Sequence, residues 1–354
     1  MRVIDNMEIH ENYSLKGLNT FGIDVKARRV VFLHGSTPDD PSRFGREVDE
    51  LLAGGLLQGE YMIIGEGSNI VFTKDYEGTV VKVGETAYQC GSDDRGRLLT
   101  VGAGMLTDEM VRISVACGCY GAENLSAIPG NIGAAVVQNI GAYGVEIKDL
   151  VDAVDAVDLH TGQRRTFTAG ECAFGYRDTI FKHQPGRWLI CRVRLRFAPV
   201  FRPNLAYKAL ADELKRRGIS NPTQQQMRDV VTDIRWGKLP RPEEHGSAGS
   251  FFKNPSVSAP SFLRLKALYP DMPDAHPVGD ENNPQYKLSA GWLIDRAGWK
   301  GRIMSRAGVW PKNALVLYNT GHCTGGDVVA LAGAIVDDVR SKFGITLEPE
   351  AIII

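Results

Sequence analysis

Short apolar runs separated by turn-forming residues dominate the first part of the chain, and this pattern is typical of buried β-strands. Such runs occur at residues 30–33, 61–64 and 79–83. Between the first two, residues 41–57 carry apolar positions at helical spacing and predict one helix. The alternation of strand and helix indicates a small α/β unit.

Residues 97–200 carry further strand patterns and little helix. The expected strands are residues 98–101, 151–159, 164–168 and 188–197, and the expected helix covers residues 108–116. The connections at 161–162 and 184–186 are too short for crossovers, so we expect antiparallel pairing.

The remaining pattern predicts helices at residues 205–217, 224–237, 289–297 and 326–343, with 237–245 as a linker. A third unit is therefore expected after the linker. The mixture of strand-rich and helix-rich stretches predicts an α+β enzyme of three parts.

The amino-acid composition limits which kinds of binding partner are expected. The 354 residues include 41 basic and 42 acidic side chains, so neither nucleic acid nor an anionic membrane is expected as a partner. The N-terminal residues show no secretory signal and no apolar run reaches about 20 residues, which predicts a cytoplasmic protein. The six cysteines and seven histidines form no metal-binding pattern, so we expect reduced thiols and no metal site.

Two glycine-rich segments suggest a nucleotide-type cofactor. Gly65-Glu-Gly-Ser-Asn69 follows an expected strand, where backbone N–H groups could hold a pyrophosphate, although a hairpin turn fits this segment alone slightly better. Ile128–Ala135 and Asn139–Gly144 then gather small residues in one span. Two such blocks let main-chain amides approach a phosphate closely and favour the cofactor.

A hydroxyl on a glycine-flanked turn is the first candidate for chemistry. Ser250 lies within Gly246–Pro255, followed by Phe251, Phe252 and the cation Lys253. This arrangement could hold a substrate and donate a proton to it. A capped turn leading into a buried strand explains the same residues equally well.

Charged residues in other parts of the chain are further candidates for catalysis. Arg177, in Gly175–Thr179, could clamp a carboxylate or stabilise an enolate, or it could simply pair with Asp178 at the surface. Glu348 and Glu350 fall on one face of an expected final strand. Burial of these two would raise a carboxyl pKa, whereas a solvated edge strand would leave both acids ordinary.

Taken in order, the motifs resemble the UDP-N-acetylenolpyruvoylglucosamine reductase family, flavoenzymes of bacterial peptidoglycan precursor synthesis. The resemblance covers residue 13 to the end. It rests on Asn19–Phe21, Gly65–Asn69, Ile128–Gly130, Asn139–Gly144, Gly175–Asp178, Gly249–Pro255, Ala290–Ile294 and Leu347–Glu350. Arg202–Tyr207 is similar to the Tyr-bearing insertion that covers the substrate in one subclass.

The resemblance implies a vanillyl-alcohol-oxidase-like FAD-binding fold of two subdomains plus a C-terminal α+β substrate-binding domain. Residues 1–85 and 344–354 would form the first subdomain and 86–237 the second, with an insertion around 200–222. Residues 238–343 would form the substrate-binding domain. The family also implies NADPH and a UDP-sugar enolpyruvate as substrates. Nothing in the sequence demands more than a monomer, and no membrane is expected as a partner.

Site residues follow from the same resemblance. Arg177, Ser250 and Glu350 would be catalytic. The expected FAD contacts are Gly65, Glu66, Gly67, Ser68, Asn69, Pro129, Gly130, Gly133, Ala134, Gln138 and Gly141. The expected substrate contacts are Tyr143, Tyr176, Tyr207, Lys238 and Asn254.

The implied reaction takes hydride from NADPH through FAD to the enolpyruvyl group. Arg177 and Glu350 would stabilise the enolate, and Ser250 would protonate it. Ser247, Thr179 and Ile352 depart from the residues usual in the family. Two alternatives are another FAD-dependent oxidase or dehydrogenase of the same fold and a nucleotide-sugar-binding protein without catalysis.

Overall fold

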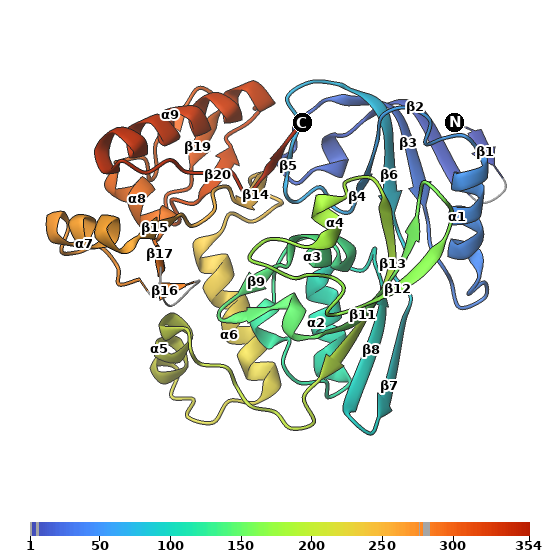
Figure 1. Cartoon of the computed structure of the whole chain (residues 1–354), viewed down its shortest axis with the longest axis horizontal. Helices are drawn as coiled ribbons and strands as arrows, with labels where there is room; N and C mark the ends of the chain where they lie inside the picture. Colours follow the sequence, from blue (N-terminus) through green and yellow to red (C-terminus); the bar gives the residue numbers. More distant parts are fainter. Residues whose placement is uncertain (1, 5–6, 276, 279–283) are drawn as a thin grey trace. The chain divides into compact units, whose positions relative to one another are not determined.

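The computed structural model describes residues 2–4, 7–275, 277–278 and 284–354. The chain divides into two compact units, each built from separate segments (Figure 1). Unit 1 comprises Met1–Tyr13, Lys26–Glu66 and Tyr76–Arg235. Unit 2 comprises Ser14–Val25, Gly67–Asp75 and Trp236–Ile354.

The first sheet of unit 1 contains the three strands expected in the N-terminal part. Its order is β1 (Arg2–Ile4), β2 (Met7–Ser14), β3 (Lys26–Leu33), β6 (Tyr76–Val83) and β4 (Tyr61–Ile64). Strand β6 runs parallel to both β3 and β4, and α1 (Arg43–Ala53) makes the connection from β3 to β4. The β-branched residues Val30, Val31, Val80 and Val81 are fully buried in this sheet.

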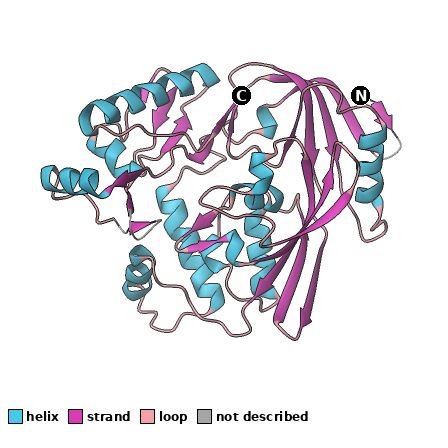
Figure 2. Cartoon of the chain, viewed as in Figure 1, coloured by secondary structure: helices cyan, strands magenta, loops and turns pink. Residues whose placement is uncertain are grey.

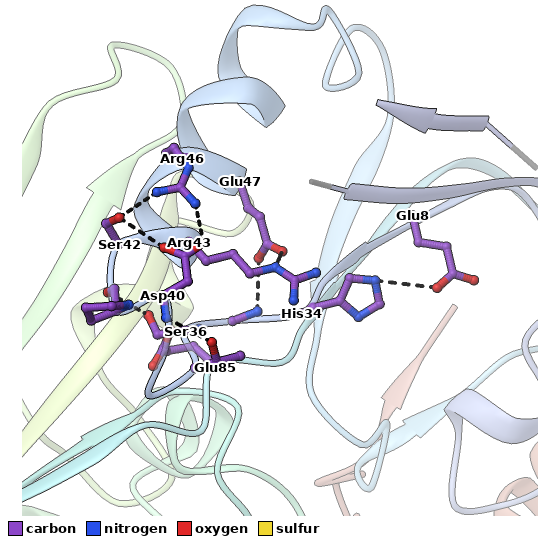
Figure 3. Close-up of polar contacts among 12 residues, drawn as sticks. Glu8, His34, Ser36, Asp40, Ser42, Arg43, Arg46, Glu47 and Glu85 are labelled. Carbon is purple, nitrogen blue, oxygen red and sulfur yellow. Dashed lines mark hydrogen bonds and ion pairs between the residues drawn. The ribbon is translucent and has the colours of Figure 1, made fainter. Parts of the chain in front are cut away.

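Two buried carboxylates fix the loop between β3 and α1 (Figure 3). Glu47 accepts the Gly35 backbone N–H at 2.9 Å and pairs with Arg43 at 3.0 Å. Glu85 accepts the Ser36 and Ala87 N–H groups at 2.8 and 3.1 Å. Both glutamates therefore satisfy backbone donors that would otherwise be buried without partners.

The second sheet of unit 1 is antiparallel throughout, as predicted. Its order is β12 (Arg164–Thr168), β11 (Val151–Asp158), β13 (Trp188–Phe197), β8 (Gly96–Gly102) and β7 (Tyr88–Asp93). Its accompanying helices are α2 (Thr107–Ala116), α3 (Ile132–Gln138) and α4 (Ile180–His183). Figure 2 shows the strands gathered into sheets with helices beside them.

Shorter elements complete unit 1. They are the 3-10 turns η2 (Glu123–Leu125) and η3 (Ile147–Asp149) and the small hairpin of β9 (Gly141–Ala142) and β10 (Val145–Glu146). Within residues 200–222, where the insertion is expected, the chain forms α5 (Lys208–Arg216), which precedes α6 (Gln224–Lys238). These two helices share an apolar cluster of Leu210, Leu214, Met227, Val230 and Val231, so α5 packs against α6.

Unit 2 has a sheet in the order β14 (Ser247–Ser250), β20 (Val316–Asn319), β19 (Ala307–Val309) and β18 (Ile303–Met304). A second sheet has the order β15 (Ser256–Ser258), β17 (Gln285–Lys287) and β16 (Pro277–Val278). The remaining elements are η1 (Lys16–Leu18), α7 (Ala259–Leu268), α8 (Ala290–Arg296) and α9 (Gly325–Phe343). Thr324 and Asp327 form a capping box that starts α9.

The final strand differs from its prediction. Residues 345–350 are not a regular strand; instead β21 (Ile352–Ile353) pairs in parallel with β5 (Ile70–Val71). The expected strand therefore begins two residues after Glu350. The division into two FAD subdomains and a substrate domain stays a prediction.

Within the described ranges, no helix has the length and apolarity needed to cross a bilayer. The same residues contain no group of three or more His, Cys, Asp or Glu side chains placed to hold a metal ion.

The Asn19 side chain organises the loop that joins β2 to β3. Asn19 is 5% exposed, and its Nδ2 donates to the Leu15 and Ile23 carbonyl oxygens at 2.7 and 3.0 Å. Its Oδ1 accepts the Ile23 N–H at 3.0 Å. One amide group thus replaces three backbone hydrogen bonds that the loop cannot make internally.

We predict that Asn19→Ala lowers the free energy of unfolding by about 3 kcal/mol, because buried backbone groups lose their partners. Urea denaturation followed by tryptophan fluorescence measures the loss. Asn221→Ala, at an exposed position, is the matched control and should change stability by less than about 0.5 kcal/mol. Equal midpoints for both variants would contradict the structural role of Asn19.

Candidate active site

The turn after β4 begins with Gly65 and Glu66, which a lysine holds in place. Lys82 on β6 donates to the Gly65 carbonyl oxygen at 2.6 Å and to Glu66 Oε1 at 2.5 Å. The Lys82 side chain is only 16% exposed. Because this ion pair is partly desolvated and also binds the main chain, it restrains the turn more than a surface pair would.

The segment continues into unit 2 as Gly67–Asn69, whose consecutive backbone N–H groups form a cluster of donors, here called a nest. Within the described residues, the N–H groups of Gly67, Ser68 and Asn69 make no hydrogen bond. Gly67 has a φ of +60°, and a Cβ there would lie 2.2 Å from the Leu18 carbonyl oxygen. Consecutive N–H groups beside a left-handed residue form a concave anion site, so this segment can receive a phosphate.

The second glycine-rich segment contains the helix α3, which its composition did not predict. The Gly133 N–H donates to the Ala103 carbonyl oxygen at 2.9 Å, and a Cβ at Gly133 would lie 2.9 Å from the Ala103 Cβ. Gly133 is thus explained by close packing of α3, and its amide is already used. Pro129 and Ala134 are exposed, whereas Gly130 is buried with its carbonyl bound by the Thr107 N–H and hydroxyl.

An unsatisfied acceptor lies at the start of α3. Asn131 Nδ2 donates to the Gly104 carbonyl oxygen, while Asn131 Oδ1 is buried without a hydrogen-bond partner among the described residues. A Cβ at Gly65 would lie 2.2 Å from this Oδ1. Glycine at 65 is therefore required for the β4 turn to approach α3.

Arg177 is held in a strained turn. Its φ is +54°, and Gly175 and Asp178 close the turn by backbone hydrogen bonds of 2.8 and 3.3 Å. The guanidinium donates to the carbonyl oxygens of Asn139 at 3.1 Å and Gly141 at 3.3 Å. Backbone strain of about 1 kcal/mol or more persists mainly where function or surrounding structure demands it.

The surface-pair interpretation of Arg177 and Asp178 is wrong. The Asp178 carboxylate pairs with His183 Nε2 at 2.7 Å, and this hydrogen bond is the main cause of its lowered pKa. Gln138 likewise has a structural contact, because its Oε1 accepts from Lys182 Nζ at 3.1 Å. Lys182 also donates to the Arg177 carbonyl oxygen at 2.8 Å and so supports the turn.

Two of the predicted substrate-binding tyrosines lie together in unit 1. The rings of Tyr143 and Tyr207 meet edge to face, with centroids 5.0 Å apart. Asn124 Nδ2 ties their segments together by donating to the carbonyl oxygens of Tyr143 and Asn204 at 2.8 and 3.1 Å. Tyr207 and Tyr176 are 47% and 43% exposed, and the Arg177 guanidinium carbon lies 5.3 Å from the centre of the Tyr176 ring.

Arg235 is a candidate that the sequence pattern missed. It lies on α6, its pKa is lowered by burial, and it hydrogen-bonds to Tyr143 and to the Ala127 carbonyl oxygen at 3.2 Å. Burial also raises the pKa of Tyr143. No sequence pattern indicated this role for Arg235, because its partners are about a hundred residues away in the chain.

Ser250 and Glu350 lie on adjoining segments of unit 2. The Glu350 N–H donates to the Phe251 carbonyl oxygen at 2.7 Å, and Asn69 Nδ2 donates to the Glu350 carbonyl oxygen at 3.1 Å. Phe251 and Phe252 are buried in the core beside the exposed Ser250. Unit 2 therefore brings the main chain of Glu350 next to that of Phe251, which follows Ser250, and next to the Asn69 side chain.

Neighbouring residues have structural partners. Asn254 Oδ1 accepts the Ala290 N–H at 3.0 Å and so caps α8, while Lys253 pairs with the exposed Glu348 at 3.3 Å. Lys238 is exposed at the end of α6. Of the two acids placed on one face, Glu348 is thus a surface ion-pair partner.

One of the three departures from the family pattern has a local explanation. Thr179 is buried and its hydroxyl donates to the Val137 carbonyl oxygen at 2.8 Å. Ser247 binds Thr20 through its main chain only, with its carbonyl oxygen accepting from the Thr20 hydroxyl at 2.7 Å. Ile352 is an exposed residue of β21, and nothing in the structure explains it.

A cavity of about 540 Å³ lies between α1 and the sheet of β11, β12 and β13. Its lining includes Phe44, Arg164, Cys191 and Arg192. None of the predicted site residues lines it, so this cavity is separate from the candidate site.

Comparisons with known proteins identify related chains. Residues 241–354 match the model of the UDP-N-acetylenolpyruvoylglucosamine reductase C-terminal domain, and residues 58–168 match an FAD binding domain. UDP-N-acetylenolpyruvoylglucosamine reductases of Azoarcus and Pseudomonas aeruginosa are 43% and 44% identical, over 100% and 98% of both chains. The crystal structure of the Thermus caldophilus enzyme has a TM-score of 0.63 at 25% identity, covering 98% of each chain.

We predict that Lys82→Met weakens FAD binding about tenfold, because the turn at Gly65 and Glu66 loses a charged hydrogen-bond donor worth about 1.5 kcal/mol. Titration of the apoprotein with FAD, followed by flavin fluorescence, measures the dissociation constant. Lys215→Met removes the same charge from an exposed position of α5 and should leave binding unchanged. Equal affinities in both variants would show that the ion pair does not shape the site.

Proposed function

The chain belongs to the UDP-N-acetylenolpyruvoylglucosamine reductase family, and we propose that it reduces the enolpyruvyl group of UDP-N-acetylglucosamine enolpyruvate with NADPH. It is an FAD-containing oxidoreductase of peptidoglycan synthesis with the expected α+β FAD-binding fold. The observation that carries the proposal is the main-chain hydrogen bond between Glu350 and Phe251, the residue that directly follows Ser250.

The residues present fit FAD. The three unpaired N–H groups at Gly67–Asn69 suit a pyrophosphate, which carries negative charge and accepts several hydrogen bonds at once. Gly65, Glu66, Pro129 and Ala134 are proposed to line the cofactor as well. Bound FAD would carry hydride from NADPH to the substrate. The roles of Gly130, Gly133, Gln138 and Gly141 are proposed as support, because their groups already have protein partners.

Arg177 is proposed to stabilise the enolate that hydride transfer creates. A guanidinium remains charged at all relevant pH values and can donate two parallel hydrogen bonds to a carboxylate. Its two carbonyl contacts fix the direction of the fork before the substrate arrives. A preorganised cation of this kind stabilises developing charge without reorganisation during the reaction.

Ser250 is proposed to protonate the enolate carbon. In the described part of the chain its hydroxyl has no hydrogen-bond partner, and no histidine activates it as a nucleophile. Such a hydroxyl is better suited to donate a proton to a strong carbon base than to attack a carbonyl. Glu350, whose main chain is fixed on both sides, is proposed to hold the substrate carboxylate region together with Arg177.

Substrate binding is proposed to involve Tyr176, Tyr207 and Tyr143, with Arg235 as a further cation for the diphosphate. Lys238 and Asn254 complete the proposed set, although Asn254 keeps only its Nδ2 for a ligand. The edge contact of Tyr207 with Tyr143 supports a covering role for the insertion. We also propose a monomer located in the cytoplasm.

We predict that the purified protein is yellow and releases FAD on denaturation. NADPH consumption, measured by absorbance at the nicotinamide band, should depend on the UDP-sugar enolpyruvate. An oxidase of the same fold would instead consume oxygen with an alcohol and without NADPH. A colourless preparation unable to take up FAD would remove the proposed function.

We predict that Ser250→Ala slows flavin reoxidation by the substrate about 10³-fold, because proton donation is lost. Reduction of the flavin by NADPH should stay within about twofold, since that step needs no donor at this position. Stopped-flow flavin absorbance separates the two half-reactions. Ser256→Ala, at an exposed position of β15, is the control, and normal reoxidation in Ser250→Ala would reassign the proton donor.

A further inference from the structure

Three cysteines of unit 1 gather at the far edge of its antiparallel sheet. Cys90 lies on the edge strand β7, and Cys117 caps the C-terminal end of α2. Their sulfur atoms are 2.7 Å apart, and Cys119 follows two residues after Cys117. Cys172, Cys191 and Cys323 make no sulfur–sulfur contact, so the close pair is particular to this edge.

The three thiols differ in access. Cys90 is exposed, Cys117 is half-buried and Cys119 is 1% exposed. A small reagent in solution can therefore reach Cys90 first. Cys117 then lies next to the modified Cys90 sulfur. A second thiol in this position can attack that sulfur and displace the small thiol bound to it.

We propose that Cys90 and Cys117 form a reversible dithiol–disulfide site that oxidises with a low-molecular-weight disulfide such as glutathione disulfide. The Cys90 thiolate attacks one sulfur of the reagent, and one glutathione leaves as a thiol after taking up a proton. Cys117 loses its proton and attacks the Cys90 sulfur, which releases the second glutathione thiol. Two protein thiols are oxidised and one small disulfide is reduced, so atoms and electrons balance.

The surroundings of Cys90 make its oxidation slow. Although Cys90 as a residue is exposed, desolvation of its sulfur by nearby protein atoms raises its pKa to about 11, and the contact with Cys117 acts in the same direction. Only the thiolate reacts, so oxidation at neutral pH is slow and specific to sustained oxidising conditions. Proximity of the second thiol makes the closing step intramolecular once the first has occurred.

The disulfide would close a loop that contains β8 and α2. The Ala103 carbonyl oxygen in that loop accepts the Gly133 N–H, and the Thr107 side chain binds the Gly130 carbonyl oxygen at 3.0 Å. The crosslink would thus restrain Ala103 and Thr107, whose hydrogen bonds hold the glycine-rich segment. This inference is independent of the proposed function, because it needs neither substrate nor turnover.

Peptide mapping tests the crosslink on the FAD-loaded enzyme. The reduced protein is incubated with glutathione disulfide in mildly alkaline buffer, blocked, digested without reductant and analysed by mass spectrometry. We expect the Cys90 peptide to be joined through Cys117, with no glutathione retained. Cys119→Ser should keep the crosslink, whereas Cys117→Ser should leave glutathione on Cys90. Recovery of wild-type Cys90 as a free thiol or a glutathione adduct, or joined through Cys119, would overturn the proposal.

Thermal unfolding gives a second readout. The oxidised wild-type enzyme should unfold about 3–6 °C higher than the reduced enzyme, because the crosslink restricts the unfolded chain. Dithiothreitol should reverse the shift, and Cys90→Ser, altered at an exposed position, should show none. Identical midpoints for oxidised and reduced wild-type enzyme would refute the restraint.

Discussion

The hydrogen bond from the Glu350 N–H to the Phe251 carbonyl oxygen, 2.7 Å long, is the contact on which the candidate site depends. It is flanked by the pairing of Phe252 with Pro349 and of Lys253 with Glu348. Phe251 and Phe252 bury their rings in the core of unit 2, so the hydrogen bonds form where water competes poorly. A hydroxyl and a carboxylate are thereby positioned by main chain, which is stiffer than side-chain contacts alone.

The sequence allowed good prediction of elements with strong periodicity and poor prediction of those without it. Strands β4, β12 and β13 have their expected limits because apolar runs define buried strands. Strand β7 was missed because all six of its residues are exposed on the sheet edge, which leaves no apolar pattern. Helix α3 was missed because its glycine and alanine residues, which permit close packing, look the same as a phosphate-binding loop.

Residue types in the site were predictable from motifs, but their surroundings were not. Glu47, Glu85 and Glu350 are all partly or wholly removed from water, yet Glu85 binds backbone amides and Glu47 binds a backbone amide and Arg43. The supporting contacts of Lys82 and Arg235 join residues that are distant in the sequence, so no local pattern reports them. Whether an acid or a cation performs chemistry is therefore decided by its partners in the folded chain.

Unit 2 is assembled from segments that the chain supplies at widely separated points. The fragment matched by the C-terminal family model, residues 241–354, lacks Ser14–Val25 and Gly67–Asp75. In that fragment the Ser247 N–H would lose the Thr20 carbonyl oxygen, Asn319 Nδ2 would lose that of Phe21, and β21 would lose β5. The boundary of the recognisable domain is thus not the boundary of a cooperative folding unit, and excising it as a gene fragment would cut through the core it is meant to isolate.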